Sequence, residues 1–362
     1  MNTLPPTAEP LSAAELENLA REVKRIGIEL GFQQIGIADT DLGAAQLRLD
    51  AWLDLGRHGE MAYMARHGRK RSQPAALLPG AVRVISARMD YFPEPDAATL
   101  KTLADPRRAY LARYALGRDY HKVLRQRLKQ LTRAVAELIG DFGYRVCVDS
   151  APLLEKAAAE KAGLGWIGKH TNLINEKAGS WFLLGEILTD LALPIDAPAS
   201  NHCGSCRACL DACPTGAIVA PYELDATRCI SYLTIELRGS IPTELRPAIG
   251  NRIFGCDDCQ LACPWNKFAQ LTQETDFAPR HGLDTATLVE LFAWDEPQWE
   301  QATTGSAIRR AGYEGWLRNI AVALGNAPSD AKVLKALARR ADHPSALVRE
   351  HVSWALTRHG KV

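Results

Sequence analysis

Eight of the nine cysteines lie within residues 203–263, and their spacing nearly repeats. The first run is Cys203-x2-Cys206-x2-Cys209-x3-Cys213-Pro214, and the second is Cys256-x2-Cys259-x3-Cys263-Pro264. The first spacing is the one with which bacterial ferredoxins bind 4Fe–4S clusters. Cysteines three residues apart let one loop reach three corners of a cubane. The two runs therefore predict a site for two clusters.

Aligning the two prolines assigns every cysteine of the two runs a partner. Cys206, Cys209 and Cys213 then correspond in order to Cys256, Cys259 and Cys263. Cys203 corresponds to Cys229, which lies upstream of the inserted stretch 230–255. In two-cluster ferredoxins the cysteine before the proline ligates the other cluster. This rule predicts one 4Fe–4S cluster on Cys203, Cys206, Cys209 and Cys263, and a second on Cys213, Cys229, Cys256 and Cys259. Two structural zinc sites are the alternative, but zinc does not require this spacing twice.

The ninth cysteine, Cys147, lies in a strand-like run and is predicted to be a buried core residue. Nine cysteines in a chain without an export signal indicate cluster ligation rather than disulfides. No apolar run approaches the roughly 18 residues of a membrane span, and the best candidate, 181–193, is interrupted by Glu186 and Asp190. We therefore expect a cytoplasmic protein with no membrane partner.

Two low-potential clusters form an electron path, which requires an acceptor. Residues 114–121, 149–155 and 163–173 are the candidate stretches for holding it. Asp149 follows a strand-like run and lies next to Val148, Leu153 and Trp166, so we expect a raised pKa and a role as proton donor. The alternative is that Asp149 caps the helix that Pro152 begins. No Gly-x-Gly-x-x-Gly follows a first strand, so a nicotinamide site has little support.

The elements that must position these residues alternate in type before the cysteines. Strand-like runs lie at 35–38, 82–85, 144–148 and 181–188, and helical stretches at 45–52, 120–138 and 153–162; a further helix begins at the capping box of Ser12 and Glu15. The alternation predicts a multidomain fold of the α/β or α+β class. We expect a disordered leader at 1–11, an α/β catalytic domain at 12–198, a ferredoxin-type domain at 199–270 and a helical domain at 271–362.

The helical domain combines a repeat-like pattern with positive charge. Residues 342–356 resemble one HEAT-type helical repeat, and a related helix runs from 307 to a stop at 325–326. Residues 308–362 contain ten Lys and Arg against four acids, and residues 107–133 contain nine against Asp119 alone. Solvated helix faces are the ordinary explanation for either stretch alone. Both together favour a polyanionic partner.

The chain resembles the epoxyqueuosine reductase family over nearly its whole length. The resemblance rests on residues 148–152, 165–171, 179–189, 256–260, 318–319 and 323–326. It implies a cobalamin-dependent iron–sulfur enzyme that reduces epoxyqueuosine to queuosine at the wobble position of tRNA anticodons. The implied partners are tRNA and an external low-potential electron donor, and we expect a monomer. The implied core fold and cofactor set are similar to those of reductive dehalogenases.

The resemblance also implies site residues. Asp149 would be the proton donor. The cobalamin contacts would be Arg71, Ala112, Asp119, Asp149, Trp166, Gly168, Lys169, His170, Asn172, Ser180, Glu236, Asp258 and Cys259. The tRNA contacts would be Arg309, Arg310, Arg318, Lys332 and Lys335, with the helix after Arg107. The Asp-x-His-x-x-Gly cobalamin motif is absent, because His121 is followed by Lys, Val and Leu; the family is thought to bind cobalamin without a histidine on cobalt.

Two other functions remain possible interpretations of the sequence. A reductive dehalogenase-like cobalamin enzyme acting on a small molecule would share the clusters and the cofactor, but it would have no use for a basic helical tail. A non-enzymatic ferredoxin-type electron carrier would have no need of a domain of this size before the cysteines.

Overall fold

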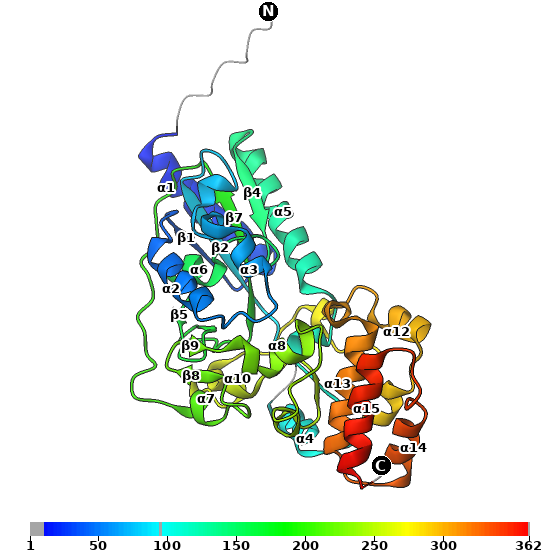
Figure 1. Cartoon of the computed structure of the whole chain (residues 1–362). Helices are drawn as coiled ribbons and strands as arrows, with labels where there is room; N and C mark the ends of the chain where they lie inside the picture. Colours follow the sequence, from blue (N-terminus) through cyan, green and yellow to red (C-terminus); the bar gives the residue numbers. More distant parts are fainter. Residues whose placement is uncertain (1–10, 94–95, 361–362) are drawn as a thin grey trace, which may run out of the picture.

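The computed structural model describes residues 11–93 and 96–360. The predicted disordered leader, residues 1–11, lies almost wholly outside the described residues. Along the chain a sheet with flanking helices is followed by a cysteine-rich part and then by a group of helices (Figure 1). Within residues 11–93 and 96–360, no helix combines the length and apolar character needed to cross a membrane.

The central sheet has four strands and is antiparallel throughout. Its order is β1 (Gln34–Ala38), β2 (Arg83–Asp90), β7 (Phe182–Thr189) and β4 (Tyr144–Cys147). All four predicted strands are present. Alternating strands and helices often indicate a parallel sheet, but here each neighbouring pair runs in opposite directions, so this part has α+β character. At the centre of the sheet, Glu186 of β7 is in register with Ser86 of β2 and Cys147 of β4.

Helices cover both faces of this sheet, because side chains alternate along each strand. On one face α1 (Ala13–Glu29) and α5 (Tyr120–Ile139) pack on Ile85 and Ile187. On the other face α6 (Glu155–Lys161) packs on Val84, Cys147 and Leu188. The predicted capping box of Ser12 and Glu15 begins α1. The other elements before the cysteines are α2 (Gly43–Asp54), α3 (Tyr63–Arg66), α4 (Asp96–Ala104), β3 (Tyr110–Leu111), β5 (Trp166–Ile167) and β6 (Leu173–Ile174).

The cysteine-rich part consists of short elements. They are α7 (Ala208–Asp211), β8 (Ile218–Ala220), β9 (Glu223–Leu224), α8 (Ile230–Ile235), α9 (Arg246–Ile249), β10 (Arg252–Phe254) and α10 (Asp258–Leu261). The helices α7 and α10 occupy equivalent places in the two cysteine runs and contact each other. This contact brings together two runs that are some fifty residues apart in the sequence.

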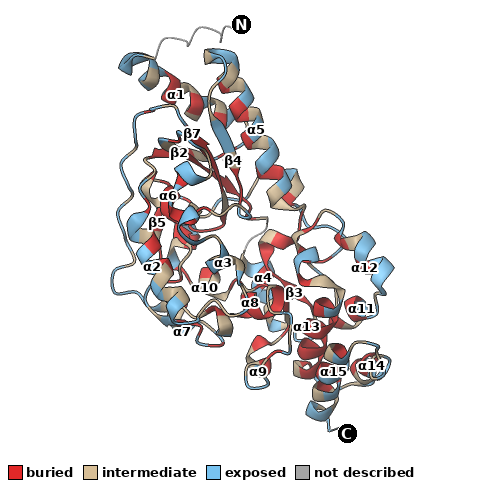
Figure 2. Ribbon diagram, turned by 45° about the horizontal axis from the view of Figure 1, so that its top comes forward, coloured by how far each residue is buried: buried red, intermediate tan, exposed pale blue. Residues whose placement is uncertain are grey.

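The last part is helical, with α11 (Leu288–Phe292), α12 (Glu296–Thr303), α13 (Gly312–Asn326), α14 (Ala331–Ala338) and α15 (Ala346–Arg358). Helix α13 ends where the sequence predicts, but it begins at Gly312 after a 3-10 turn over Ala307–Ala311. Figure 2 shows α13 buried along most of its length. It lies between α15 on one side and α9 and β10 on the other, so these helices share one core with the cysteine-rich part.

Candidate active site

A cavity of about 380 Å³ reaches from Asp149 to four cysteines. Asp149, Glu155 and Lys156 line it on the side of the sheet domain, and the cysteines line it on the other side. Those cysteines are Cys213, Cys229, Cys256 and Cys259. A cavity lined by an acidic side chain and four cysteines can combine redox chemistry with proton transfer.

A second cavity, of about 310 Å³, is lined by the other four cysteines of the two runs. They are Cys203, Cys206, Cys209 and Cys263. The two cavities therefore divide the eight cysteines into the same two groups as the ferredoxin alignment. His170, which is 3% exposed, lines both cavities and lies between the two groups. None of these cysteines forms a disulfide with another described residue.

Trp166 and Lys169 belong to the second cavity's surroundings. The Trp166 indole N–H donates to Cys203 Sγ at 3.5 Å. Lys169 Nζ donates to the carbonyls of Gly204 and Cys206 at 2.6 and 2.8 Å. These contacts hold the loop of the first cysteine run, and neither residue lines the first cavity, so their contact with cobalamin stays a prediction.

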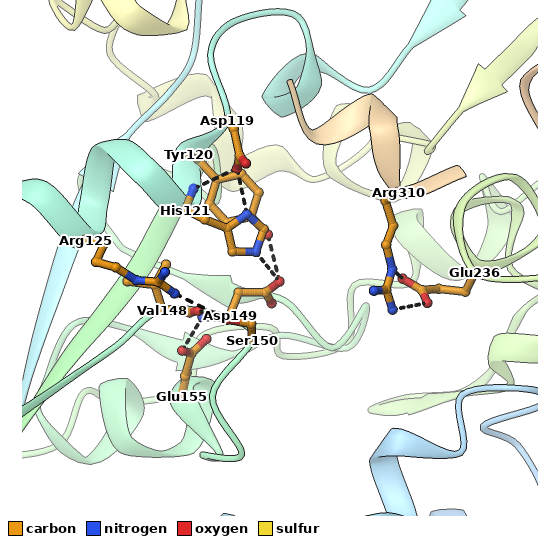
Figure 3. Close-up of polar contacts among 10 residues, drawn as sticks. All are labelled: Asp119, Tyr120, His121, Arg125, Val148, Asp149, Ser150, Glu155, Glu236 and Arg310. Atoms are coloured by element: carbon orange, nitrogen blue, oxygen red, sulfur yellow. Dashed lines mark hydrogen bonds and ion pairs between the residues drawn. The ribbon is translucent and has the colours of Figure 1, made fainter. Parts of the chain in front are cut away.

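Asp149 stands on the loop after β4 with its side chain in the first cavity (Figure 3). Its φ is +47°, a left-handed conformation that Asp and Asn tolerate better than most residues. The backbone N–H of Asp149 donates to Glu155 Oε1 at 2.6 Å, which fixes the loop to α6. Its Oδ2 accepts from the Tyr120 hydroxyl and from His121 Nε2, each at 2.9 Å.

His121 lies between two carboxylates. Asp119 caps α5, accepting from the His121 backbone N–H at 3.1 Å and from the His121 ring at Nδ1 at 2.8 Å, so Nε2 faces Asp149. A ring nitrogen that contacts a carboxylate must donate, so the two contacts together require an imidazolium. Burial alone would lower the pKa of His121, but hydrogen bonds and charge from Asp119 and Asp149 raise it to about 9.

The pKa of Asp149 is shifted downward, opposite to the prediction. Desolvation by the cavity walls raises it, as the apolar neighbours suggested. The hydrogen bond and charge of His121, with the Tyr120 hydroxyl, outweigh desolvation and hold the pKa of Asp149 below its ordinary value. The prediction of a raised pKa is wrong for the resting protein because it ignored His121. At neutral pH the transferable proton is therefore on His121, one hydrogen bond from Asp149.

A buried, unpartnered donor tests whether the first cavity fits a bound cofactor. The Asn172 backbone N–H donates to His170 Nδ1 at 3.1 Å, so the ring hydrogen is on Nε2. His170 Nε2 has no partner among the described residues. Desolvation, with the charge of Lys156, lowers the pKa of His170 to about 4, so the ring is neutral. Buried donors are nearly always satisfied, so this N–H fits an acceptor on a group bound in one of the two cavities that His170 lines.

The structure separates the predicted cobalamin contacts into two sets. Those that line the first cavity are Asp149, His170, Asn172, Ser180, Asp258 and Cys259. Those that do not are Arg71, Ala112, Asp119, Trp166, Gly168, Lys169 and Glu236. Arg71 is buried and donates to the carbonyls of Tyr63 and Met64, and Asp119 acts on His121 instead. Lys156, which lines the cavity, was missed because a lone lysine in a helix ordinarily faces solvent.

The predicted tRNA contacts also divide. Arg309, Lys332 and Lys335 are exposed. Arg310 pairs with both oxygens of Glu236 at 3.0 and 2.8 Å, and this pair lies to the right of Asp149 in Figure 3. Arg318 is 1% exposed and donates to the carbonyls of Leu233, Leu237 and Gly239. Placing Arg318 among the tRNA contacts is therefore wrong, because its guanidinium is used inside the protein.

A basic stripe runs along the outer face of α5. It consists of Lys122, Arg125, Lys129 and Arg133, all exposed and spaced three or four residues apart. Arg125 also reaches Ser150 Oγ at 3.4 Å, so the stripe leads to the loop of Asp149. We call these four residues the α5 stripe. They lie within the basic stretch 107–133 noted in the sequence.

Comparison with known proteins agrees with this site. Residues 202–266 match a family described as a 4Fe-4S double cluster binding domain, and residues 71–150 match one described as epoxyqueuosine reductase QueG, DUF1730. The epoxyqueuosine reductase of Pseudomonas aeruginosa is 60% identical over 98% of this chain and 99% of its own length. That of Escherichia coli is 57% identical over 96% of this chain and 91% of its own length.

Solved structures agree as well. A crystal structure of epoxyqueuosine reductase with an epoxyqueuosine-modified tRNA-Tyr stem loop has a TM-score of 0.88, 31% identity, and coverage of 96% of this chain and 91% of that chain. A structure of the Bacillus subtilis epoxyqueuosine reductase has a TM-score of 0.86 and 31% identity, and the match covers 95% of this chain and 91% of that chain. In that structure a catalytic loop that contains an aspartate is swung out of the active site. By sequence, fold and site, the chain belongs to the epoxyqueuosine reductase family.

Proposed function

We propose that this protein reduces the epoxide of epoxyqueuosine to the alkene of queuosine in the anticodon loop of tRNA, in the cytoplasm. The observation that supports this most directly is the single cavity in which Asp149, paired with His121, faces the cysteines of the second predicted cluster. A simple electron carrier has no need of an acid–base pair there. The exposed α5 stripe favours a nucleic acid over the small substrate of a dehalogenase-like enzyme.

The parts of the chain then have separate roles. Residues 12–198 would form the cobalamin-binding catalytic domain, and residues 199–270 the double 4Fe–4S domain. Residues 271–362 would form a HEAT-like helical domain that contacts tRNA, since α13 and α15 pack as a helix pair. The cofactors of the family are two 4Fe–4S clusters and cobalamin.

Electrons would enter from an external low-potential donor at the cluster on Cys203, Cys206, Cys209 and Cys263. That group contains Cys206, which is the exposed cysteine among the eight. The cluster on Cys213, Cys229, Cys256 and Cys259 would follow, because its cysteines line the cavity of Asp149. The grouping is supported by the two cavities and by the contact between α7 and α10.

The first cavity, which is lined by Asp149 and by the cysteines of the second predicted cluster, would hold cobalamin. When bound, cobalamin supplies low-valent cobalt, which provides the electrons for breaking a carbon–oxygen bond. His170 Nε2, Asn172 and Ser180 would hold it, because they line the cavity and His170 lacks another acceptor. The substrate base would be drawn out of the anticodon loop toward Asp149, since enzymes that act on a base remove it from its stack.

Asp149 and His121 would deliver the proton. Breaking a carbon–oxygen bond of the epoxide leaves an alkoxide, which departs readily only when it is protonated. His121 holds the proton and Asp149 stands between His121 and the cavity, so Asp149 is the group that would pass the proton to the substrate oxygen. Asp119 keeps the imidazole ring aligned for this transfer.

Anaerobic reconstitution tests this function. Protein with both clusters and added cobalamin, supplied with a chemical reductant and epoxyqueuosine-containing tRNA, should yield a nucleoside lighter by one oxygen, detected by mass spectrometry after digestion. Omitting cobalamin should prevent the conversion. An unchanged nucleoside in the complete reaction would contradict the proposal.

The α5 stripe should bind tRNA phosphates. Changing Lys122, Arg125 and Lys129 together to Glu should weaken tRNA binding on the order of 100-fold at low salt. The salt dependence of binding should also become flatter, because fewer counterions are released when fewer phosphates are contacted. Binding measured at several salt concentrations, with iron content as a check on folding, gives both quantities. The tail residues Arg309, Lys332 and Lys335 would add smaller contributions.

A matched pair of single variants separates location from charge. Lys129→Glu should weaken tRNA binding, whereas Lys177→Glu should not. Lys177 is a suitable control because it is also exposed but lies away from the α5 stripe, at a different cavity beside β5. If the triple variant and the wild type bound tRNA with equal affinity and equal salt dependence, the α5 stripe would be ordinary solvated surface and not a tRNA-binding site.

The His121 pair predicts the pH dependence. The pKa of His121 is about 9, so the transferable proton is present below that pH and is lost as the pH rises through it. The value of kcat/KM should therefore fall above pH 9, with no acidic limb from Asp149 near neutrality, because its pKa lies below the ordinary value. His121→Gln should be slower and lack the alkaline limb. A limb that persists unchanged in His121→Gln would belong to another group.

A further inference from the structure

A second carboxyl group lies behind Asp149, inside the protein. Glu186 is at the middle of β7, 0% exposed, on the face of the sheet that α6 covers. Among residues 11–93 and 96–360 neither carboxyl oxygen has a hydrogen-bond partner by distance and angle. The side chain in register on β2, Ser86, is equally buried, and its hydroxyl is also unpartnered among these residues.

Such a carboxyl must be protonated at neutral pH. An ionised carboxylate in an apolar interior without a cation is so unfavourable that the group takes up a proton instead. Desolvation, followed by the charge of Glu155, raises the pKa of Glu186 well above its ordinary value. Desolvation and the charge of Asp149 raise the pKa of Glu155 as well. Two neighbouring carboxyls cannot both ionise there, so the pair retains at least one proton.

Among the described residues, no cation forms an ion pair with either carboxyl, and the nearby cations make their hydrogen bonds to other groups. Lys156 Nζ donates to Thr171 O and Asn172 Oδ1 at 3.0 and 3.2 Å, and Arg71 donates to two backbone carbonyls. His121 is held by Asp119 and Asp149. The groups that face the pair from the elements around it are Asp149, His121 and Tyr120 of α5, Lys156 of α6, Cys147 of β4 and Arg71.

The pair reaches the active site through Glu155. Glu155 lines the first cavity, and its Oε1 accepts from the Asp149 backbone N–H at 2.6 Å. Glu186 does not line this cavity, but in addition to desolvation Glu155 acts directly on Glu186 and raises its pKa. A proton on Glu186 would have to pass through Glu155 to reach the cavity beside Asp149.

The reaction requires two protons. The two carbon–oxygen bonds of the epoxide break, a carbon–carbon double bond forms, and the oxygen leaves as water, consuming two electrons and two protons. The electrons come through the clusters. The His121–Asp149 pair supplies one proton. We propose that Glu155 and Glu186 store the second, so that both protons are inside the protein before the substrate binds; this rests on the function proposed above.

Infrared spectroscopy of the resting, cluster-loaded protein tests the store without substrate. Wild type at neutral pH should show a protonated carboxyl band, shifted in D2O, that Glu186→Gln lacks. Ser86→Ala, a change in the same buried place, should keep the band. Absence of the band in wild type would show that the pair holds no proton and would overturn the proposal, whether or not the enzyme turns over.

Proton uptake during a single turnover tests the use of the store. In wild type, product should form before solvent protons are taken up, as followed with a pH indicator. In Glu186→Gln, which keeps the shape but carries no transferable proton, uptake should accompany product. The rate should fall about tenfold or more near pH 8 and recover toward pH 6, where solvent protons are more abundant.

The variants keep the outcomes distinct. Glu155→Gln should behave like Glu186→Gln, which covers the case in which the Glu186 variant does not fold. Identical uptake and identical pH dependence in wild type and both variants would overturn the proposal. Failure of wild type itself to form product would count against the proposed function, while the infrared result would still report on the stored proton.

Discussion

Replacing Asp149 with Asn should lower the single-turnover rate by about two to four decades, the range typical for loss of a general acid. Asn can still accept from the Tyr120 hydroxyl, but it cannot take the proton from His121 and pass it on. The measurement is a single turnover with chemically reduced protein, which separates the proton step from electron delivery.

The variant should fold and keep both clusters. The Asp149 side chain is 59% exposed, to the cavity, and Asn tolerates the positive φ of this position as Asp does. Losing one of its two carboxylate partners should lower the pKa of His121, visible by NMR titration, because the Asp149 hydrogen bond and charge both raise it. Ser150→Ala, in the next residue, is the matched control and should retain the rate. A near-normal rate in Asp149→Asn would show that water or another group, and not Asp149, donates the proton.

The sequence was sufficient wherever the signal is local. The capping box of α1, the four strands and the stop of α13 each depend on neighbouring residues, and each is confirmed. Cys147, flanked by two valines, is buried as predicted at 1% exposure. Strand direction was not accessible in this way, because the antiparallel register is set by contacts between distant segments.

The misjudged residues share one physical cause. The pKa direction of Asp149 depends on His121, which is 28 residues away in the chain and meets it only through the fold. Arg318 has the charge of a phosphate contact, but its helix is covered on both sides and backbone carbonyls surround the guanidinium. Charge is visible in a sequence, whereas burial of a charge is not. The neighbours Trp316 and Ile320, both buried, were the only local signal.

Replacing Cys203 or Cys229 with Ser should abolish turnover, because each change breaks the electron path at a different cluster. Wild type should contain about eight irons, and each variant about half of that. Iron analysis and low-temperature EPR of anaerobic protein give the count and identify the remaining cluster. Cys147→Ser is the matched control, since Cys147 lines neither cysteine cavity, and it should keep all of the iron.

The grouping of the cysteines gives the sharper form of this test. Cys263→Ser should leave the same cluster as Cys203→Ser, although the two residues are far apart in the sequence, because both line the second cavity. Cys213→Ser should match Cys229→Ser instead, because both line the cavity of Asp149. If Cys263→Ser matched Cys229→Ser, the crossover assignment of the cysteines would be wrong. Stoichiometric zinc in protein prepared with ample iron would show that the cysteines form structural zinc sites and not 4Fe–4S clusters. The pairing matters for the proposed function, because the cluster on Cys213, Cys229, Cys256 and Cys259 would supply electrons in the same cavity in which Asp149 would deliver the proton.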